Sequence, residues 1–413
     1  MALTDRIVTW FSRLGAVEMA ILLALVAQVL FLIDIGQPAQ MMFDETHYVP
    51  AARAIFQMTG PMNIEHPPFA KWLIGLSMTI FGDNPAGWRI IGTGMGTATV
   101  LAVYAIALGL FGDIRTAATA GLLTLLNQLV YIQARVGMLD VYMGAFLLAA
   151  IALIIHSRGR EKGALAMLAA AGLCLGLSVA CKWAAIPYVA AACLCFIFLR
   201  RRYWPQIHML AGLGALGLVS LGAYFLTFTP MLFYAREPVA PSELIALQFT
   251  MLELQTQPLA PHNYMSVWWQ WPLITRPIWY LYESVACVMR GVLLVGNPAI
   301  MWGGLVAVGA ALWAGFRDRA PVLLFVAALY LFAYGLWIII PKQIGFYFYY
   351  YLPAIFLSLA LAGMFQHYRM RRIPALFLAI SAALFVYFFP ILSAAELPND
   401  HAFEHWTWFD SWR

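Results

Sequence analysis

Residues 320–340 read APVLLFVAALYLFAYGLWIII, a stretch of 21 residues without a charged side chain. About 20 apolar residues are enough for an α-helix to cross a bilayer, so this stretch predicts a membrane-spanning helix. The whole chain agrees, because 63% of its 413 residues are hydrophobic, 10% are charged, and the mean hydropathy is +0.80. Such a composition cannot cover a water-soluble surface. Because the apolar runs are continuous rather than alternating, an outer-membrane barrel is excluded as well. We therefore expect an all-α polytopic membrane protein.

Ten further apolar runs bring the expected number of transmembrane helices to eleven. They lie near residues 15–35, 90–111, 116–134, 138–156, 164–181, 184–199, 207–228, 291–315, 345–366 and 374–392. The first run is long enough to span and ends without a small-residue cleavage site, so we expect no cleavable signal peptide. No feature favours a nucleic-acid partner. We expect residues 1–413 to form one integral-membrane domain.

Basic residues gather in alternate connections, which orients the chain. They lie at 158–162, 200–202, 317–319 and 369–372, on the same side as Arg6, Arg13 and Arg115. The positive-inside rule places this side and the N-terminus in the cytoplasm. Two long segments, 36–89 and 229–290, and the tail 393–413 then lie on the outer face. Long loops in a compact bundle are commonly functional, and we expect short interfacial helices within these two, at 74–81 and 244–254.

The first outer segment begins with two adjacent carboxylates, Asp44 and Glu45, directly after the first span. One interpretation is the N-cap of a helix over residues 48–58. The other is a general base, because partial burial beside a second acid raises the basicity of a carboxylate. The sequence EHPPFAK at 65–71 then presents His66 and Lys71, although a proline turn before a helix explains this stretch equally well.

Ionisable residues at other expected outer helix ends suggest an anion site. Arg89 opens the second span, Arg135 and Asp140 flank a tight turn, and Lys182 closes the fifth span. Interfacial anchoring explains one or two such residues. Convergence of Arg89, Arg135 and Lys182 on one side predicts a site for a lipid-linked phosphate. The cysteines show no metal-type spacing and are interpreted as small core residues.

Several motifs together resemble the protein O-mannosyltransferase family. They run in the family's order from about residue 43 to 353. These motifs are FDE at 43–45, HPPFAK at 66–71, MLD at 138–140, CKW at 181–183, WWQWPL at 268–273, RPIWY at 276–280, GNP at 296–298 and YYYLP at 349–353. The block WWQWPL with RPIWY is the most specific of them, and the tryptophan-rich tail at 406–412 matches more weakly.

The resemblance implies a GT-C fold with its active site on the non-cytoplasmic face. Such an enzyme transfers mannose, or a similar hexose, with inversion from polyprenyl phosphate to Ser or Thr hydroxyls of exported proteins. By resemblance, Asp44 is the catalytic base and Glu45 its partner. The residues implied to bind the donor sugar and phosphate are His66, Lys71, Arg89, Arg135, Asp140 and Lys182. Those expected in the acceptor loop are His262, Tyr264, Trp269 and Arg276.

Two departures from the family pattern suggest a bacterial member in the inner membrane. The second long loop lacks the inserted soluble domain of eukaryotic members, and Tyr350 stands where many of them have histidine. We expect no required cofactor, although Asp44, Glu45, His47 and His66 offer ligands for a divalent metal. The sequence leaves open whether the protein forms an oligomer.

Three other functions fit the sequence less well. A transferase of the same fold could act on a glycolipid or polysaccharide, such as lipid A. The sequence hardly distinguishes such an enzyme from one that acts on proteins. A carrier for a polyprenyl-linked sugar would need the cations but no base aligned to a hydroxyl. A structural membrane subunit would not need so many ionisable residues on its outer face. The acid pair Asp44 and Glu45 beside outer cations therefore favours a transferase.

Overall fold

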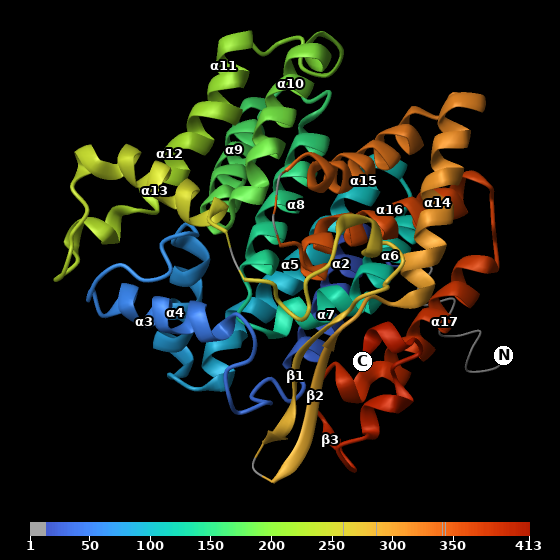
Figure 1. Cartoon of the computed structure of the whole chain (residues 1–413). Helices are drawn as coiled ribbons and strands as arrows, with labels where there is room; N and C mark the ends of the chain where they lie inside the picture. The colour runs from blue at the N-terminus through green and yellow to red at the C-terminus, as the bar shows by residue number, and fades with distance from the viewer. Residues whose placement is uncertain (1–13, 259, 286, 341, 343) are drawn as a thin grey trace.

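The computed structural model describes residues 14–258, 260–285, 287–340, 342 and 344–413, and it is mostly helical (Figure 1). Arg6 and Arg13, which entered the orientation argument, lie outside this range. The first half of the chain forms α2 (Ala16–Leu32), α3 (Glu45–Phe56), α4 (Phe69–Phe81), α5 (Pro85–Phe111), α6 (Ile114–Leu126), α7 (Gln128–Arg135), α8 (Leu139–Ser157), α9 (Ala164–Cys181) and α10 (Ile186–Tyr203). The second half forms α11 (Met209–Leu213), α12 (Val219–Leu226), α13 (Leu244–Thr256), α14 (Pro298–Arg317), α15 (Pro321–Ile339), α16 (Tyr351–His367) and α17 (Ile373–Phe388).

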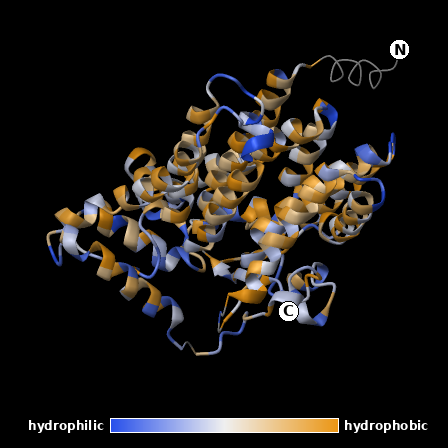
Figure 2. Cartoon of the chain, turned by 90° about the horizontal axis from the view of Figure 1, so that it is seen from above, coloured by the Kyte–Doolittle hydropathy of each residue, from blue (hydrophilic) through white to orange (hydrophobic). Residues whose placement is uncertain are grey.

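Among the described residues, nine helical segments are long and apolar enough to cross a membrane. They start at residues 85, 139, 164, 183, 209, 298, 321, 347 and 373. The remaining two predicted runs form the shorter apolar helices α2 and α6. Every predicted apolar run thus contains a helix, and the helices of the bundle consist mostly of hydrophobic residues (Figure 2). The count of eleven crossings stays a prediction.

Two predicted spans are divided differently in the structure. The run at 116–134 breaks at Asn127, whose side chain accepts a hydrogen bond from the Leu129 amide and starts α7. The run expected at 291–315 begins as a strand, and helix α14 starts only at Pro298. There the Asn297 side chain caps the helix by accepting from the Ala299 amide. Asparagine favours caps because its side chain competes for backbone donors, which apolar run length alone does not reveal.

A small antiparallel sheet, which the sequence did not predict, accompanies the helices. Strand β1 (Ile278–Val285) pairs with β2 (Val288–Leu294), and β2 pairs with β3 (Glu396–Leu397) of the tail. The first four residues of β1 and the last four of β2 are all buried, so neither strand alternates clearly between apolar and polar. A buried strand of this kind cannot be told from a helix by periodicity.

Helices α3 and α4, the sheet and the C-terminal tail gather at one end of the bundle, lower in Figure 1, which we call the loop end. The connection between α10 and α11 lies at the opposite end. Short helices are present where they were predicted, at 74–81 and 244–254, as α4 and α13, with α4 beginning earlier, after Pro67 and Pro68. The helix expected at 48–58 is α3, which begins at Glu45.

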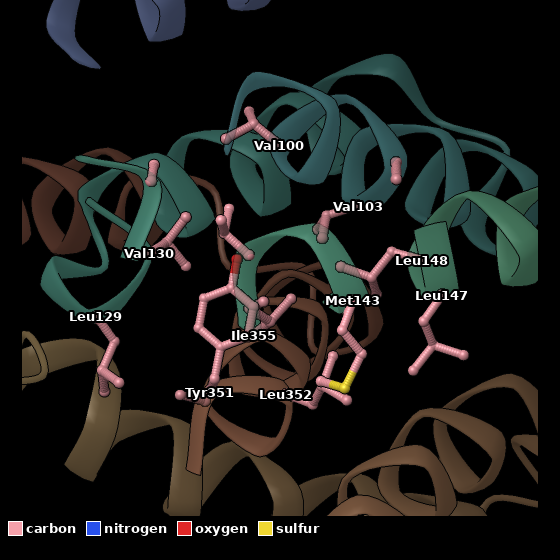
Figure 3. Packing of buried hydrophobic residues seen from close by; sticks show 14 of the residues in the cluster. Val100, Val103, Leu129, Val130, Met143, Leu147, Leu148, Tyr351, Leu352 and Ile355 are labelled. Atoms are coloured by element: carbon pink, nitrogen blue, oxygen red, sulfur yellow. The ribbon is translucent and has the colours of Figure 1, made fainter. Parts of the chain in front are cut away.

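A densely packed core holds the loop end in place. Buried side chains of α5, α7, α8 and α16 interlock around Val103, Val130, Met143 and Tyr351 (Figure 3). Gly144 of α8 allows α16 to approach closely, since a Cβ atom there would lie 2.6 Å from a ring carbon of Tyr351. Native cores leave few voids and deform little. The beginning of α8 and the end of α9 are therefore rigid supports for side chains that face the loop end.

Candidate active site

A cavity of about 690 Å³ opens at the loop end between segments that are distant in the sequence. Its floor comes from the start of α3 and the loop before α4, and its walls come from the ends of α9, α13 and α15. The polar residues lining it are Asp44, His47, Tyr48, Asn63, Glu65, His66, Lys182, Gln255, Thr256, Gln257, Lys342 and Tyr349. Asp44, His66 and Lys182 among the predicted site residues are thus brought together.

Asp44 is presented to this cavity by a sharp turn of the backbone. The preceding residue, Phe43, has φ of 48°, a left-handed conformation that costs a non-glycine residue about 1–3 kcal/mol. Its ring stacks on Tyr280 of β1 at a centroid distance of 4.4 Å, which holds the turn. The Tyr48 hydroxyl donates a hydrogen bond of 3.2 Å to Oδ2 of Asp44. One carboxylate oxygen is therefore oriented by the protein while the residue faces the cavity.

Glu45 points away from the cavity and acts as an anchor. It is fully buried and forms a two-pronged ion pair with Arg89, in which both N–O distances are 2.8 Å. The amides of Met42 and Gly137 also donate to its two oxygens. Four donors on one carboxylate leave it little capacity to accept a proton from substrate. Glu45 fixes the start of α3, and thereby the position of Asp44.

Of the three cations expected to converge on an anion, only Lys182 lines the cavity. Arg89 also donates to the carbonyls of Ile35 and Pro38. Arg135 donates to carbonyl oxygens at the C-terminal end of α2, including that of Phe31 at 3.1 Å. Arg135 thus satisfies carbonyls at the end of α2, whereas Arg89 is committed to Glu45 and to carbonyls of the loop that follows α2. The geometry therefore assigns Arg89 and Arg135 to the scaffold around the site rather than to its surface.

Lys182 is held beside the cavity by Asp140. Its ammonium lies 2.9 Å from both carboxylate oxygens, and the side chains of both residues are almost fully buried. The rings of Phe348 and Tyr349 lie 4.9 and 5.1 Å from the same nitrogen. An ion pair and cation–π contacts together stabilise the charge in a desolvated place. The tight turn predicted between Arg135 and Asp140 is what brings α8 into position.

His66 and Lys71 have different environments although they are close in sequence. The Lys71 ammonium lies beneath the loop before α4 and donates to the His66 carbonyl at 2.7 Å and to the Asn63 carbonyl. Burial lowers the pKa of Lys71 to about 7. Among the described residues no group bonds Nδ1 of His66, and burial, aided by nearby Lys182, holds the pKa of its ring well below the usual range. His66 is therefore a neutral imidazole in the cavity, and Lys71 supports its loop.

Lys342 is a cavity residue that the sequence analysis missed. It follows α15 and lines the cavity near Lys182. Partial burial of the Lys342 side chain lowers its pKa, and the nearby charge of Lys182 lowers it further. Its place, directly after an uncharged span of 21 residues, resembles an ordinary interfacial anchor. A single lysine after a span carries no signal for a site. Tyr48 was missed similarly, because helical position alone did not reveal its contact with Asp44.

The residues expected in the acceptor loop are divided. His262 and Arg276 line a second cavity of about 750 Å³ next to the first, whereas Tyr264 and Trp269 line neither. Trp269 is 53% exposed. Tyr350 is buried, and its hydroxyl lies 2.7 Å from that of Tyr330, away from both cavities.

The residues suggested as metal ligands do not form a cluster. In the part of the chain that the structure describes, no group of three His, Cys, Asp or Glu side chains is close enough to hold an ion. Glu45, one of the four suggested ligands, is saturated by Arg89 and two backbone amides.

We expect the activity to depend on the ionisation of Asp44. Burial raises the pKa of its carboxyl above the usual 3.8, and the charges of Lys182 and His47 offset this in part. Only the ionised form can take a proton, so kcat/KM should fall as the pH is lowered through the raised pKa. A pH profile of kcat/KM should show the midpoint of its acidic limb above 3.8. Tyr48→Phe removes a bond to the ionised form and should move that midpoint higher; a midpoint that stays in place would contradict this assignment.

Comparison with known proteins identifies the family of this chain. Two family models together cover most of the chain: "Dolichyl-phosphate-mannose-protein mannosyltransferase" matches residues 65–225, and "C-terminal four TMM region of protein-O-mannosyltransferase" matches residues 241–412. The chain belongs to the protein O-mannosyltransferase family. A relative from Corynebacterium glutamicum, named polyprenol-phosphate-mannose–protein mannosyltransferase, is 27% identical over 90% of this chain and 88% of its own. One of the same name from Mycolicibacterium smegmatis is 25% identical, over 95% and 92%.

Solved structures confirm the predicted GT-C fold of this protein O-mannosyltransferase. The Saccharomyces cerevisiae Pmt1–Pmt2 complex bound to the sugar donor matches with a TM-score of 0.82 and 13% identity, over 97% of this chain and 93% of that one. ArnT from Cupriavidus metallidurans in the apo state matches with a TM-score of 0.61 and 16% identity, over 94% and 67%. The chain is thus a multi-pass membrane protein of this fold.

Proposed function

We propose that this family member transfers mannose, or a similar hexose, from polyprenyl phosphate to Ser or Thr hydroxyls of exported proteins. The observation that carries the proposal is Asp44, an oriented carboxylate in a cavity that also holds Lys182 and a neutral His66. The names of the curated relatives support the donor and the acceptor. The basic connections support a cytoplasmic N-terminus and an active site on the outer face of the bacterial plasma membrane.

The reaction is an inverting single displacement. The acceptor oxygen attacks the anomeric carbon of the sugar, and the bond from that carbon to the phosphate oxygen breaks. The acceptor proton passes to the Asp44 carboxylate, and polyprenyl phosphate leaves with the bonding electron pair. A phosphate can leave without a proton donor when cations stabilise its growing charge. Asp44 is the general base, and Glu45 is a positioning residue that reaches the substrate only through the turn at 43–45.

Lys182 and Lys342 are the cations that face the phosphate in this proposal. A lysine ammonium has three N–H donors, and Asp140 takes at most two of those on Lys182. At least one remains for a phosphate oxygen. Lys342 makes no side-chain hydrogen bond to another described residue and can turn toward the same anion. His66 is neutral, so its Nδ1 can serve the sugar hydroxyls as a hydrogen-bond partner without adding charge.

In this proposal the prenyl chain of the donor extends from the cavity into the bilayer. A small void of about 10 Å³ lies beside Asp140 where α8, α10, α15 and α16 meet, and it is lined among others by Met143, Tyr188, Leu336 and Leu352. Only 17% of the window in α10 and 28% of that in α15 are buried inside the protein. Both helices therefore expose most of their surface to the surrounding lipid. The prenyl chain would therefore leave the cavity laterally, between α10 and α15, into the bilayer.

A reconstituted transfer assay tests the proposal. Purified protein is incubated with radiolabelled polyprenyl-phosphate mannose, a Ser/Thr-rich peptide and a glycolipid acceptor in parallel. Label on the peptide is the expected result. Label on the glycolipid alone would show that the acceptor is a glycolipid rather than a protein, with the same transfer reaction. Donor that binds without transfer to either acceptor would favour a carrier.

We expect Lys182→Gln to weaken donor binding by roughly 10- to 100-fold, since hydrogen bonds to charged groups contribute about 1.5–3 kcal/mol. Equilibrium binding of the labelled donor in detergent measures this. The double variant Lys182→Gln with Asp140→Asn controls for the buried acid left unpaired, and it should bind as weakly as the single variant. Lys162→Gln, at the opposite end of the bundle, is the matched control. Donor binding unchanged in Lys182→Gln would remove Lys182 from the phosphate site.

A further inference from the structure

A second cavity lies against the candidate active site and is not explained by the donor. It measures about 750 Å³, and three residues at the end of α15 and just after it line both cavities: Trp337, Ile340 and Lys342. The rest of its lining comes from residues 261–276 and 344–345, beyond the outer end of α15. The two cavities therefore share a wall, and the second one lies in a loop region rather than between spanning helices.

The ionisable side chains that line the second cavity are all basic. Its ionisable residues are His262, Arg276 and Lys342, and no described carboxylate lines it. Arg276 donates to the Asn263 carbonyl, which holds the guanidinium in place and leaves further N–H groups free. Ser266 and Gln270 are already engaged, by the Trp271 ring N–H and the Val267 amide. The fork of a guanidinium matches carboxylate and phosphate groups, and carboxylate is the one of the two that an ordinary polypeptide side chain carries.

The second cavity is within reach of Asp44. The His262 ring packs edge-on against Phe43, with centroids 6.5 Å apart, and Phe43 directly precedes Asp44. His262 also packs against Phe346, at 5.3 Å, and Phe346 lines the first cavity. An extended polypeptide advances about 3.3 Å per residue, so two to four residues span roughly 7–13 Å. A chain with its hydroxyl at Asp44 would reach over Phe43 and His262 into the second cavity, whose lining includes Arg276.

We propose that this second cavity binds the acceptor polypeptide and selects an acidic side chain two to four residues from the target hydroxyl. The proposal rests on the proposed function. Arg276 receives the carboxylate, and Lys342, on the shared wall, faces both this group and the donor phosphate. A polypeptide fits better than a glycolipid because the lining is built largely from loops beyond the apolar helix ends. Arg276 is thus a specificity-determining residue that contacts the acceptor away from the reacting atoms.

The experiment measures steady-state transfer of labelled mannose to a peptide series. Each peptide carries one threonine, with aspartate, asparagine or lysine placed two, three or four residues to either side. We compare the unchanged protein, Arg276→Gln and the matched control Arg236→Gln, an exposed arginine that lines neither cavity. We expect the aspartate peptide to have a KM at least tenfold below that of its asparagine counterpart. Arg276→Gln should remove this difference while kcat and the donor KM stay unchanged, and Arg236→Gln should keep it.

The outcomes separate this proposal from the proposed function. Transfer to peptides without a preference for aspartate, or a preference that survives in Arg276→Gln, would overturn the acidic-residue site and leave the transferase standing. No transfer to any peptide, with transfer to an anionic glycolipid, would overturn both the peptide acceptor and this proposal. A fall in kcat of Arg276→Gln on all peptides equally would show that Arg276 acts on folding or chemistry, which also contradicts the proposal.

Discussion

Replacing Asp44 by asparagine is expected to lower the turnover by roughly 10²- to 10⁴-fold, the range that a well-placed general base contributes. The amide is close in shape to the carboxylate and can still accept the hydrogen bond from Tyr48, so the turn at Phe43 should persist. What disappears is the group that takes the acceptor proton. Donor binding should therefore remain close to that of the unchanged protein. Initial rates of mannose transfer, together with equilibrium binding of the donor, measure the two effects separately.

Asp83→Asn is the matched control for this prediction. Asp83 lies near the same end of the bundle, pairs with Arg53 at the surface and does not line the cavity. Its replacement should leave turnover nearly unchanged. Turnover of Asp44→Asn equal to that of the control would exclude Asp44 as the base. A loss of donor binding in parallel with turnover would mean instead that Asp44 holds the sugar.

Arg89→Met is expected to reduce the free energy of unfolding by about 3–5 kcal/mol, the cost of leaving a buried charge without its partner. Glu45 and Arg89 are both fully buried, and their carboxylate and guanidinium groups make two bonds of 2.8 Å. Without Arg89, the carboxylate keeps only the amides of Met42 and Gly137. Unfolding by sodium dodecyl sulfate in mixed micelles measures the loss. Because Glu45 positions Asp44, the surviving folded protein should also be less active.

Two further variants make this prediction specific. The double variant Glu45→Gln with Arg89→Met removes the unpaired charge, so it should recover a large part of the lost stability. Arg53→Met is the matched control, since it breaks the surface pair with Asp83, and surface pairs contribute about 0–1 kcal/mol. Equal losses in Arg53→Met and Arg89→Met would contradict an anchoring role for the buried pair. Full activity in Arg89→Met would show that Asp44 does not depend on this anchor.

The contrast between Arg89 and Lys182 shows where prediction from sequence ended. Both are basic residues near an expected outer helix end, and the resemblance implied a place at the donor phosphate for both. In the structure Lys182 faces the cavity, whereas Arg89 and Arg135 are consumed by Glu45 and by backbone carbonyls. Sequence places a residue along the chain and at a depth in the membrane. Its partner depends on side-chain direction and on segments more than forty positions away.

The sequence by itself determined the class of the protein, the apolar segments that become helices, and the acid pair that starts the site. These follow from local properties, namely run length, charge asymmetry between connections and motif order. Only the tertiary structure decided that Asp44 faces the cavity while Glu45 is buried, that Lys342 joins Lys182, and that residues 278–285 and 288–294 form strands. The physical reason is that these features depend on packing between distant segments. A left-handed residue at Phe43, stacked on Tyr280 more than two hundred positions away, decides which carboxylate is free to act.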